Sequence, residues 1–180
     1  MKHLNKLSEE VIHENPWYAY KHDTYEKPNG EVGDYYYSDL RGMAIIVPVF
    51  PDGRLLLILQ SRYLTDKESV EFPGGGLRDG QTAIEAAREE LLEETGYVAD
   101  EFIKVGEFQP ANGYAKDTTH VFMAHVSEHR EMNLDDTEEI EVLYRRPDEI
   151  DEMIRRNDIW DGQTMATWAL VHHHFLHNDK

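Results

Sequence analysis

The sequence predicts an α+β fold in which a mixed β-sheet lies between helices. The expected elements follow the order strands, one central helix, more strands and two final helices. A purely parallel sheet would need strands and helices in regular alternation, which this order lacks. With 180 residues, no internal repeat and no long linker, the chain suits one domain with a core of ordinary size.

The first 40 residues are expected to form a polar lead-in and an antiparallel aromatic β-hairpin. Residues 1–15 are mostly polar and have room for one helical turn. Strand-like aromatic runs at residues 17–21 and 34–38 are separated by the turn signal Pro28-Asn29-Gly30. Neighbouring side chains of a strand point to opposite faces, so some of these rings are expected to face a core or a partner.

The main domain is expected to occupy residues 41–180 and to open with two buried strands. The apolar runs at residues 43–50 and 55–60 flank the turn signal Pro51-Asp52-Gly53, which predicts a hairpin. Pro48 cannot donate a hydrogen bond to a neighbouring strand, so it predicts an edge position or a bulge. The other elements are strands at residues 70–72, 103–108, 120–126 and 140–143 and helices at 148–156, after Pro147, and at 164–177.

The central stretch, residues 74–97, joins a glycine loop to a capped helix. Thr82 and Glu85, three residues apart, form a capping box, so the helix should begin at Thr82. Gly96 suits the left-handed conformation that ends many helices. The residues expected to face the core are Ile84, Ala87 and Leu91, spaced at i, i+3 and i+7.

The same helix carries acidic residues whose spacing predicts a metal site. Glu90, Glu93 and Glu94 are three and four residues apart, so their carboxylates lie on one side of the helix. Carboxylates gathered in this way repel one another unless a cation holds them, and oxygen ligands suit Mg²⁺ or Mn²⁺. A solvated acidic face is the alternative. The glycine-rich turn that leads directly into the capped helix favours the metal site.

The stretch resembles the Nudix box, G-x5-E-x7-R-E-U-x-E-E-x-G-U, where U is an apolar residue. Aligned on residues 93–97, the box begins at Gly75 and departs from the pattern at two positions. Gln81 replaces the first glutamate and Glu89 replaces the arginine. In the family these two positions brace the metal ligands.

Two arrangements of the altered positions are open. Gln81 and Glu89 lie on one helical stripe, so the Gln81 amide could donate a hydrogen bond to the Glu89 carboxylate. Alternatively, Arg88 pairs with Glu85 and leaves Glu89 as an additional negative charge. In both arrangements the metal-ligand positions of the box are retained.

Further motifs resemble one Nudix subfamily, the ADP-ribose pyrophosphatases, and the resemblance covers residues 13–170. Gln60-Ser61-Arg62 and Glu71-Phe72-Pro73-Gly74-Gly75 are similar to its Q-Y-R and E-L-P-G-G pattern, with serine in place of tyrosine. The loop at residues 109–114 and the run at residues 138–142 resemble its proline-containing loop and the segment with its additional catalytic glutamate. In this subfamily an aromatic N-terminal hairpin stacks the adenine and takes part in a domain-swapped homodimer.

The resemblance implies an α/β/α sandwich, the Nudix fold, and a Mg²⁺-dependent hydrolase, with Mn²⁺ as a possible substitute. The substrate would be a nucleoside-diphosphate-linked compound, ADP-ribose or a related nucleotide sugar, cleaved at its pyrophosphate bond. Two alternatives remain open: a catalytically impaired domain that senses nucleotide sugars, and a hydrolase of nucleoside triphosphates.

The implied site residues fall into three groups. The metal would be held by Gly74, Glu90, Glu93 and Glu94. The catalytic carboxylates would be Glu94 with Glu138 or Glu139, one of which takes a proton from water. The substrate would contact Trp17, Tyr18, Arg62 and Gly75. For Arg62 a structural pairing with Glu71 is an equally good interpretation, and for the two aromatic residues packing is the more common role.

The composition argues against several other classes. The formal net charge is −18, from 36 acidic and 18 basic residues, so neither nucleic acid nor an anionic membrane is an expected partner. The absence of cysteine excludes disulfides and thiol chemistry and is compatible with a cytoplasmic location. No apolar run is long enough to span a membrane, and the start does not resemble a signal peptide. The histidines at 172–174 and 177 are interpreted as ordinary helix residues.

Overall fold

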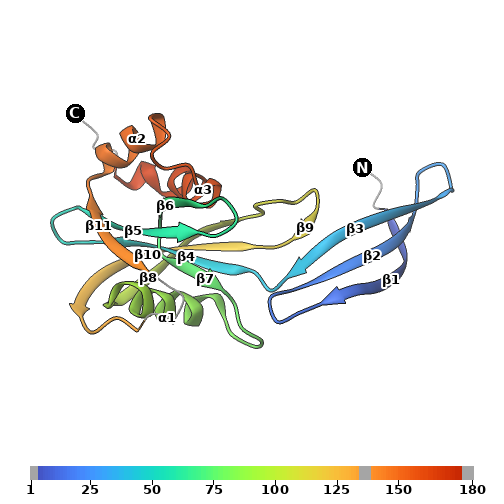
Figure 1. The fold of residues 1–180 in the computed structure, drawn as a ribbon, viewed down its shortest axis with the longest axis horizontal. Coiled ribbons are helices and arrows are strands. Elements are labelled where there is room, and N and C mark those ends of the chain that lie inside the picture. The colour runs from blue at the N-terminus through green and yellow to red at the C-terminus, as the bar shows by residue number, and fades with distance from the viewer. Residues whose placement is uncertain (1–3, 134–138, 176–180) are drawn as a thin grey trace. The chain divides into compact units, whose positions relative to one another are not determined.

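The computed structural model describes residues 4–133 and 139–175, which fall into two compact units (Figure 1). The first unit extends to Gly42 and includes the segment Gln109–Thr118. The second unit contains Met43–Phe108 and the chain from Thr119 onward. The central helix with its glutamates therefore belongs entirely to the second unit.

The first unit is built around a sheet with the strand order β1-β2-β3-β9. The predicted hairpin is formed by β2 (Tyr18–Glu26) and β3 (Val32–Leu40), which pair antiparallel. The prediction of a polar lead-in with one helical turn was wrong, because β1 (Asn5–Glu14) pairs along β2. The open edge of β2 supplies backbone partners that local composition does not reveal. The short β9 (Ala115–Lys116) lies parallel to β3.

The second unit contains a sheet that, within the described residues, has seven strands. Its main path is β11 (Ile140–Arg145), β5 (Leu55–Arg62), β4 (Met43–Val49), β10 (Thr119–His129) and β8 (Tyr97–Phe108). The short strands β6 (Lys67–Glu71) and β7 (Gly74–Gly76) pair with β5 and β4. Because β4 and β10 run parallel while the other pairs are antiparallel, the sheet is mixed, as predicted.

Pro48 lies on β4, which is a central strand, so the predicted edge position was wrong, and the register with β10 runs through Pro48 without the bulge that was the alternative. On one side the register places Pro48 opposite Ala124 of β10. On the other side, β5 pairs with β4 only at Val49, and the Ile46 N–H bonds to the Pro73 carbonyl. Backbone groups two residues apart on a strand point the same way, so the Pro48 nitrogen faces the gap between these two contacts. Proline is tolerated there because no ladder bond is lost.

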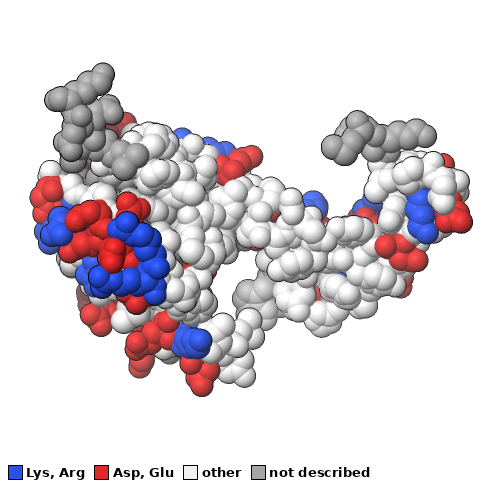
Figure 2. Space-filling view, turned by 90° about the horizontal axis from the view of Figure 1, so that it is seen from above, with Lys and Arg blue, Asp and Glu red and all other residues white. Residues whose placement is uncertain are grey.

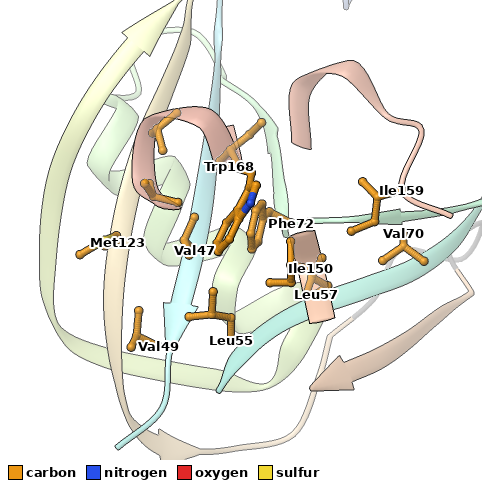
Figure 3. Close-up of a cluster of buried hydrophobic side chains, with 13 residues drawn as sticks. Val47, Val49, Leu55, Leu57, Val70, Phe72, Met123, Ile150, Ile159 and Trp168 are labelled. Atoms are coloured by element: carbon orange, nitrogen blue, oxygen red, sulfur yellow. The ribbon is translucent and has the colours of Figure 1, made fainter. Parts of the chain in front are cut away.

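Helices cover both faces of this sheet. Along β4, the buried side chains of Ala44 and Ile46 pack with Ala87 and Leu91 of α1 (Ala83–Thr95). The alternate side chains, among them Val47, join a second core with α2 (Pro147–Arg155) and α3 (Gly162–Val171) (Figure 3). This alternation follows from the two-residue repeat of a strand, and it confirms the α+β sandwich.

Two helix predictions need correction. Ile84 was expected to face the core, yet its side chain is 39% exposed, and the buried stripe of α1 starts at Ala86. Spacing identifies a helix face but not the turn at which contact with the sheet begins. The last helix, α3, ends at Val171 and is followed by a 3-10 turn at His172–His174. The predicted end at residue 177 lies outside the described residues. Among the described helices, none has both the length and the apolar composition needed to cross a membrane.

Candidate active site

The junction between the glycine strand and α1 is set by local interactions that the sequence predicted. The Thr82 hydroxyl accepts a hydrogen bond from the Glu85 N–H, and the Glu85 carboxylate accepts one from the Thr82 N–H, at 3.4 and 2.9 Å. The Thr82 hydroxyl also donates to Glu85 Oε2 at 2.7 Å, and this bond together with the one from the Thr82 N–H lowers the pKa of Glu85. At the other end Gly96 has a φ of 71°, the left-handed region, and its N–H bonds to the Leu92 carbonyl. Both ends of the helix are therefore fixed as expected.

Two adjacent glycines of β7 lie directly against two of the helix carboxylates. The Gly74 N–H donates to Glu94 Oε2 at 2.9 Å, and the Glu94 side chain is only 5% exposed. Gly75 lies against Glu90 so closely that a Cβ atom there would overlap its carboxylate, 2.5 Å from Cδ. A Cβ at Gly74 would instead overlap the backbone of β4, at Ala44 and Ile45. Glycine thus permits both close approaches.

The two departures from the Nudix box contact each other. Gln81 Nε2 donates to Glu89 Oε2 at 2.7 Å, which is the first of the two arrangements considered above. The second arrangement is not formed, because Glu85 is engaged in the capping box and the Arg88 guanidinium lies 4.6 Å from the centre of the Phe102 ring.

Arg78 completes this contact and was missed by the sequence reasoning. Its Nη1 lies 3.2 Å from Glu89 Oε2 and its Nη2 lies 3.8 Å from Glu93 Oε2. Its backbone N–H also donates to Gln81 Oε1 at 2.9 Å. The available signal was that Arg78 is the only basic residue between Gly74 and Arg88.

The predicted ligands fit a divalent cation in chemistry. Within residues 4–133 and 139–175, no three His, Asp or Glu side chains are gathered as a metal-holding group. Glu94 accepts from the Gly74 N–H, Glu90 lies against Gly75, and Glu93 faces Arg78. Oxygen donors on one helix, next to a backbone without Cβ atoms, are nevertheless the donor set that a hard cation takes.

Arg62 is held by a buried carboxylate. Its Nε donates to Glu71 Oε1 at 2.7 Å, and its Nη2 contacts Glu71 Oε2. This bidentate pair, together with Glu94 and Asp161 nearby, raises the pKa of Arg62. The pairing with Glu71, one of the two sequence interpretations, is therefore present, and it secures a Glu71 side chain that is 6% exposed.

Two motifs that are far apart in the sequence meet in one groove of the second unit. Because β11 pairs antiparallel with β5, Ile140 lies opposite Gln60. Glu139 is exposed and lines the groove with Gln60 and Ser61. The other candidate base, Glu138, lies outside the described residues.

The aromatic candidates belong to the first unit. Trp17 is 76% exposed, and the backbone N–H groups of Trp17 and Tyr18 both donate to Asn15 Oδ1. These bonds shape the turn between β1 and β2 and leave the Trp17 ring accessible. Neither residue is part of the unit that carries the acidic helix.

The largest group of basic residues visible in Figure 2 is intermixed with acidic ones. On α2 and its flanks, Arg146 pairs with Asp148, and Arg155 and Arg156 both pair with Glu152. This face therefore offers intermixed charge, and the continuous basic footprint of a nucleic-acid binder is not seen on it.

The chain was compared with known proteins. Residues 40–168 match the family model described as NUDIX domain. The chain is 29% identical over 143 residues to the ADP-ribose pyrophosphatase of Bacillus subtilis (strain 168), covering 77% of this chain and 76% of that protein. It is 26% identical over 145 residues to the methanol dehydrogenase activator of Bacillus methanolicus, covering 79% and 78%.

The fold is also shared with a solved structure. A crystal structure described as an ADP compounds hydrolase matches with a TM-score of 0.82 and 20% identity, covering 96% of this chain and 94% of that one. The glycine strand, the capped helix and its glutamates all lie inside the matched residues 40–168. The chain therefore belongs to the Nudix family and is a Nudix hydrolase.

Proposed function

We propose that this protein hydrolyses the pyrophosphate bond of a nucleoside-diphosphate-linked compound, ADP-ribose or a related nucleotide sugar, with Mg²⁺ or Mn²⁺. The observation that carries the proposal is the contact of Gly74 with Glu94 and of Gly75 with Glu90. The 29% identity to an ADP-ribose pyrophosphatase supports the substrate class. Nudix hydrolases generally use divalent metal cations.

In the proposed site, Glu90, Glu93, Glu94 and the Gly74 carbonyl hold the metal. A bound cation neutralises charge on the diphosphate oxygens and lowers the pKa of a bound water. The chain itself contributes position: the Gly74 N–H orients Glu94, and the missing Cβ of Gly75 leaves space beside Glu90. Such fixed orientation matters because phosphoryl transfer depends mainly on the placement of charge.

The proposed reaction adds one water molecule across the P–O–P linkage. The water oxygen bonds to one phosphorus, the bridging P–O bond breaks, and two phosphate monoesters leave. A carboxylate must accept the proton of the water, and Glu139 is the described candidate. Its groove brings Gln60 and Ser61 beside Glu139, Ile140 and Glu141, which supports this role.

The test is release of phosphate monoesters from ADP-ribose with Mg²⁺, followed with a coupled phosphatase. Glu94→Gln keeps an oxygen acceptor for the Gly74 N–H but removes the charge, so the fold should persist. We expect it to lower kcat by at least about 100-fold, since changes around metal ligands already cost 10–100-fold. Absence of turnover by the wild-type protein on ADP-ribose, other nucleotide sugars and nucleoside triphosphates, with ligand binding intact, would establish the sensor instead.

We further propose that the first unit joins two copies of the chain. Large apolar side chains on its strands and turns are exposed, among them Leu7, Val11, Trp17, Val32 and Tyr36. Exposed apolar groups in such numbers are typical of a surface that a partner covers. Light scattering after size exclusion should give twice the mass of the 21.0 kDa chain, and Val11→Asp should shift it toward the monomer. A monomeric wild-type protein would refute this proposal.

A further inference from the structure

Arg78 closes a ring of contacts between the loop and the acidic helix. Its backbone N–H donates to the side-chain oxygen Oε1 of Gln81, and the side-chain Nε2 of Gln81 donates to Glu89. Its guanidinium returns to the same Glu89 oxygen at 3.2 Å. Arg78 and Gln81 of one short segment and Glu89 of α1 therefore hold each other in place.

The negative charges on α1 explain why a positively charged side chain beside Glu89 and Glu93 is favourable. Glu85, Glu89 and Glu93 follow one another at four-residue spacing, so their carboxylates are neighbours on one stripe. Glu85 is engaged by Thr82 at the start of the helix. Glu89 and Glu93 are the next two, and Arg78 faces both of them. Without it, like charges at this spacing destabilise a helix.

The positive charge of Arg78 also fits the two altered positions of the Nudix box. The Nudix pattern has a glutamate at position 81 and an arginine at position 89, whereas this chain has an amide and a carboxylate. The positive charge that position 89 lacks is present on Arg78, at a distance of 3.2 Å. Compared with the Nudix pattern, position 89 carries the negative charge, and the positive charge lies on Arg78, in the segment before the helix.

We propose that Arg78 is a positioning residue that, together with Gln81, holds Glu89 and sets the orientation of Glu93 on the acidic face of α1. The proposal rests on the proposed function for its effect on turnover, but the contacts themselves can be tested without substrate or metal. It predicts that Arg78 and Glu89 are energetically coupled. It also predicts that Arg78 is no longer needed for full kcat once position 89 carries an arginine.

The first experiment is a double-mutant cycle on the metal-free protein, with Arg78→Gln, Glu89→Gln and both together. The Arg78 side chain is 66% exposed, so the pair is worth little and Arg78→Gln should lower the Tm by about 1–3 °C. In the Glu89→Gln background the loss should be less than half as large. Equal losses in both backgrounds would overturn the proposal.

The matched control is Arg88→Gln, which removes the same charge from the neighbouring residue of Glu89. Arg88 lies over Phe102 and is not part of the ring of contacts. Its effect on the Tm should be the same with and without Glu89→Gln. Coupling of Arg88 to Glu89 as large as that of Arg78 would mean that only the overall charge of the helix matters, and would overturn the assignment.

The second experiment measures turnover in two backgrounds. In the wild-type chain Arg78→Gln should lower kcat about tenfold, as expected for a residue that orients a metal ligand. In the Gln81→Glu/Glu89→Arg chain the same change should lower kcat less than about twofold, because position 89 then carries the cation. An equal loss in both backgrounds would refute the proposal. A raised KM with unchanged kcat would also refute it, by making Arg78 a substrate contact.

These experiments separate the two proposals. If the wild-type chain hydrolyses none of the nucleotide sugars, the proposed function fails, while the metal-free cycle still decides whether Arg78 holds Glu89. If turnover is present but the cycle is additive, the proposed function stands and the role of Arg78 is refuted.

Discussion

Gly74 and Gly75 are adjacent glycines whose replacement by alanine should have opposite consequences. Neither has a positive φ, so alanine can adopt both backbone conformations. The difference lies in what the new methyl group meets. At Gly74 it overlaps the Ala44 carbonyl and lies 2.9 Å from the Ile45 Cα, both backbone atoms of a central strand. At Gly75 it overlaps the carboxylate of Glu90, the end of a flexible side chain.

The expected magnitudes follow from these neighbours. β4 is held between β10 on one side and β7 on the other, so its backbone cannot retreat cheaply. Gly74→Ala should therefore lower the free energy of unfolding by about 2–3 kcal/mol, the upper range for an added methyl group in a packed site. For Gly75→Ala we expect a change within about 1 kcal/mol, because the Glu90 side chain can turn away and alanine reduces the entropy of the unfolded chain.

For catalysis we expect a large effect from Gly75→Ala, the variant that should change stability less. Gly75→Ala moves Glu90, a proposed metal ligand, and should lower kcat by about tenfold or more in a protein of nearly normal stability. Urea unfolding monitored by tryptophan fluorescence suits the comparison. Trp168 is 6% exposed, and the centre of its ring lies 6.5 Å from that of Phe72 in the core of the second unit (Figure 3). If Gly75→Ala is as destabilising as Gly74→Ala, or if Gly74→Ala is neutral, the reasoning from these contacts is wrong.

Three further predictions concern charge. Millimolar Mg²⁺ should raise the Tm, since a ligand of the folded state stabilises it by about 2.7 kcal/mol at 100 times its Kd, and Glu90→Gln/Glu94→Gln should abolish the rise in a thermal melt. Arg62→Met leaves the buried Glu71 without its guanidinium, so it should lower the urea-derived unfolding free energy by about 2 kcal/mol, and Arg62→Met/Glu71→Met should recover most of this loss. Burial raises the pKa of Asp117, so its ionised form destabilises the fold once the pH rises through that pKa. Asp117→Asn should therefore raise the Tm at about pH 7 and leave it unchanged at about pH 3, below the ordinary aspartate pKa, as thermal melts at both pH values would check.

At the candidate site, the features that sequence reasoning predicted correctly are those whose partners lie within about one helical turn. Thr82 and Glu85 are three residues apart and form the capping box, and Gly96 ends the helix in the left-handed conformation. The bond from Gln81, which precedes the N-cap, to Glu89 was only one of the two arrangements that the sequence left open. Helix geometry fixes the distances within the two caps once the helix forms, so the residue types there are enough to predict them.

The incorrect predictions depended on neighbours from elsewhere in the chain. The polar run at residues 5–14 became a strand because β2 offered an open edge, and Pro48 sits on a central strand because β5 and β7 leave a gap beside it. Ile84 is exposed because contact between α1 and the sheet begins further along the helix. Backbone pairing and layer contact of this kind are decided by partners that no local pattern identifies.

The sequence by itself therefore determined the fold class, the capped acidic helix and the family to which its motifs point. The tertiary structure decided which side chains those motifs meet. It joined Arg62 to Glu71, brought Glu139 beside Gln60 through the pairing of β11 with β5, and set Arg78 against Glu89 and Glu93. Ion pairs and grooves of this kind depend on how strands and loops are arranged in space, whereas helix caps depend only on the residues next to them along the chain.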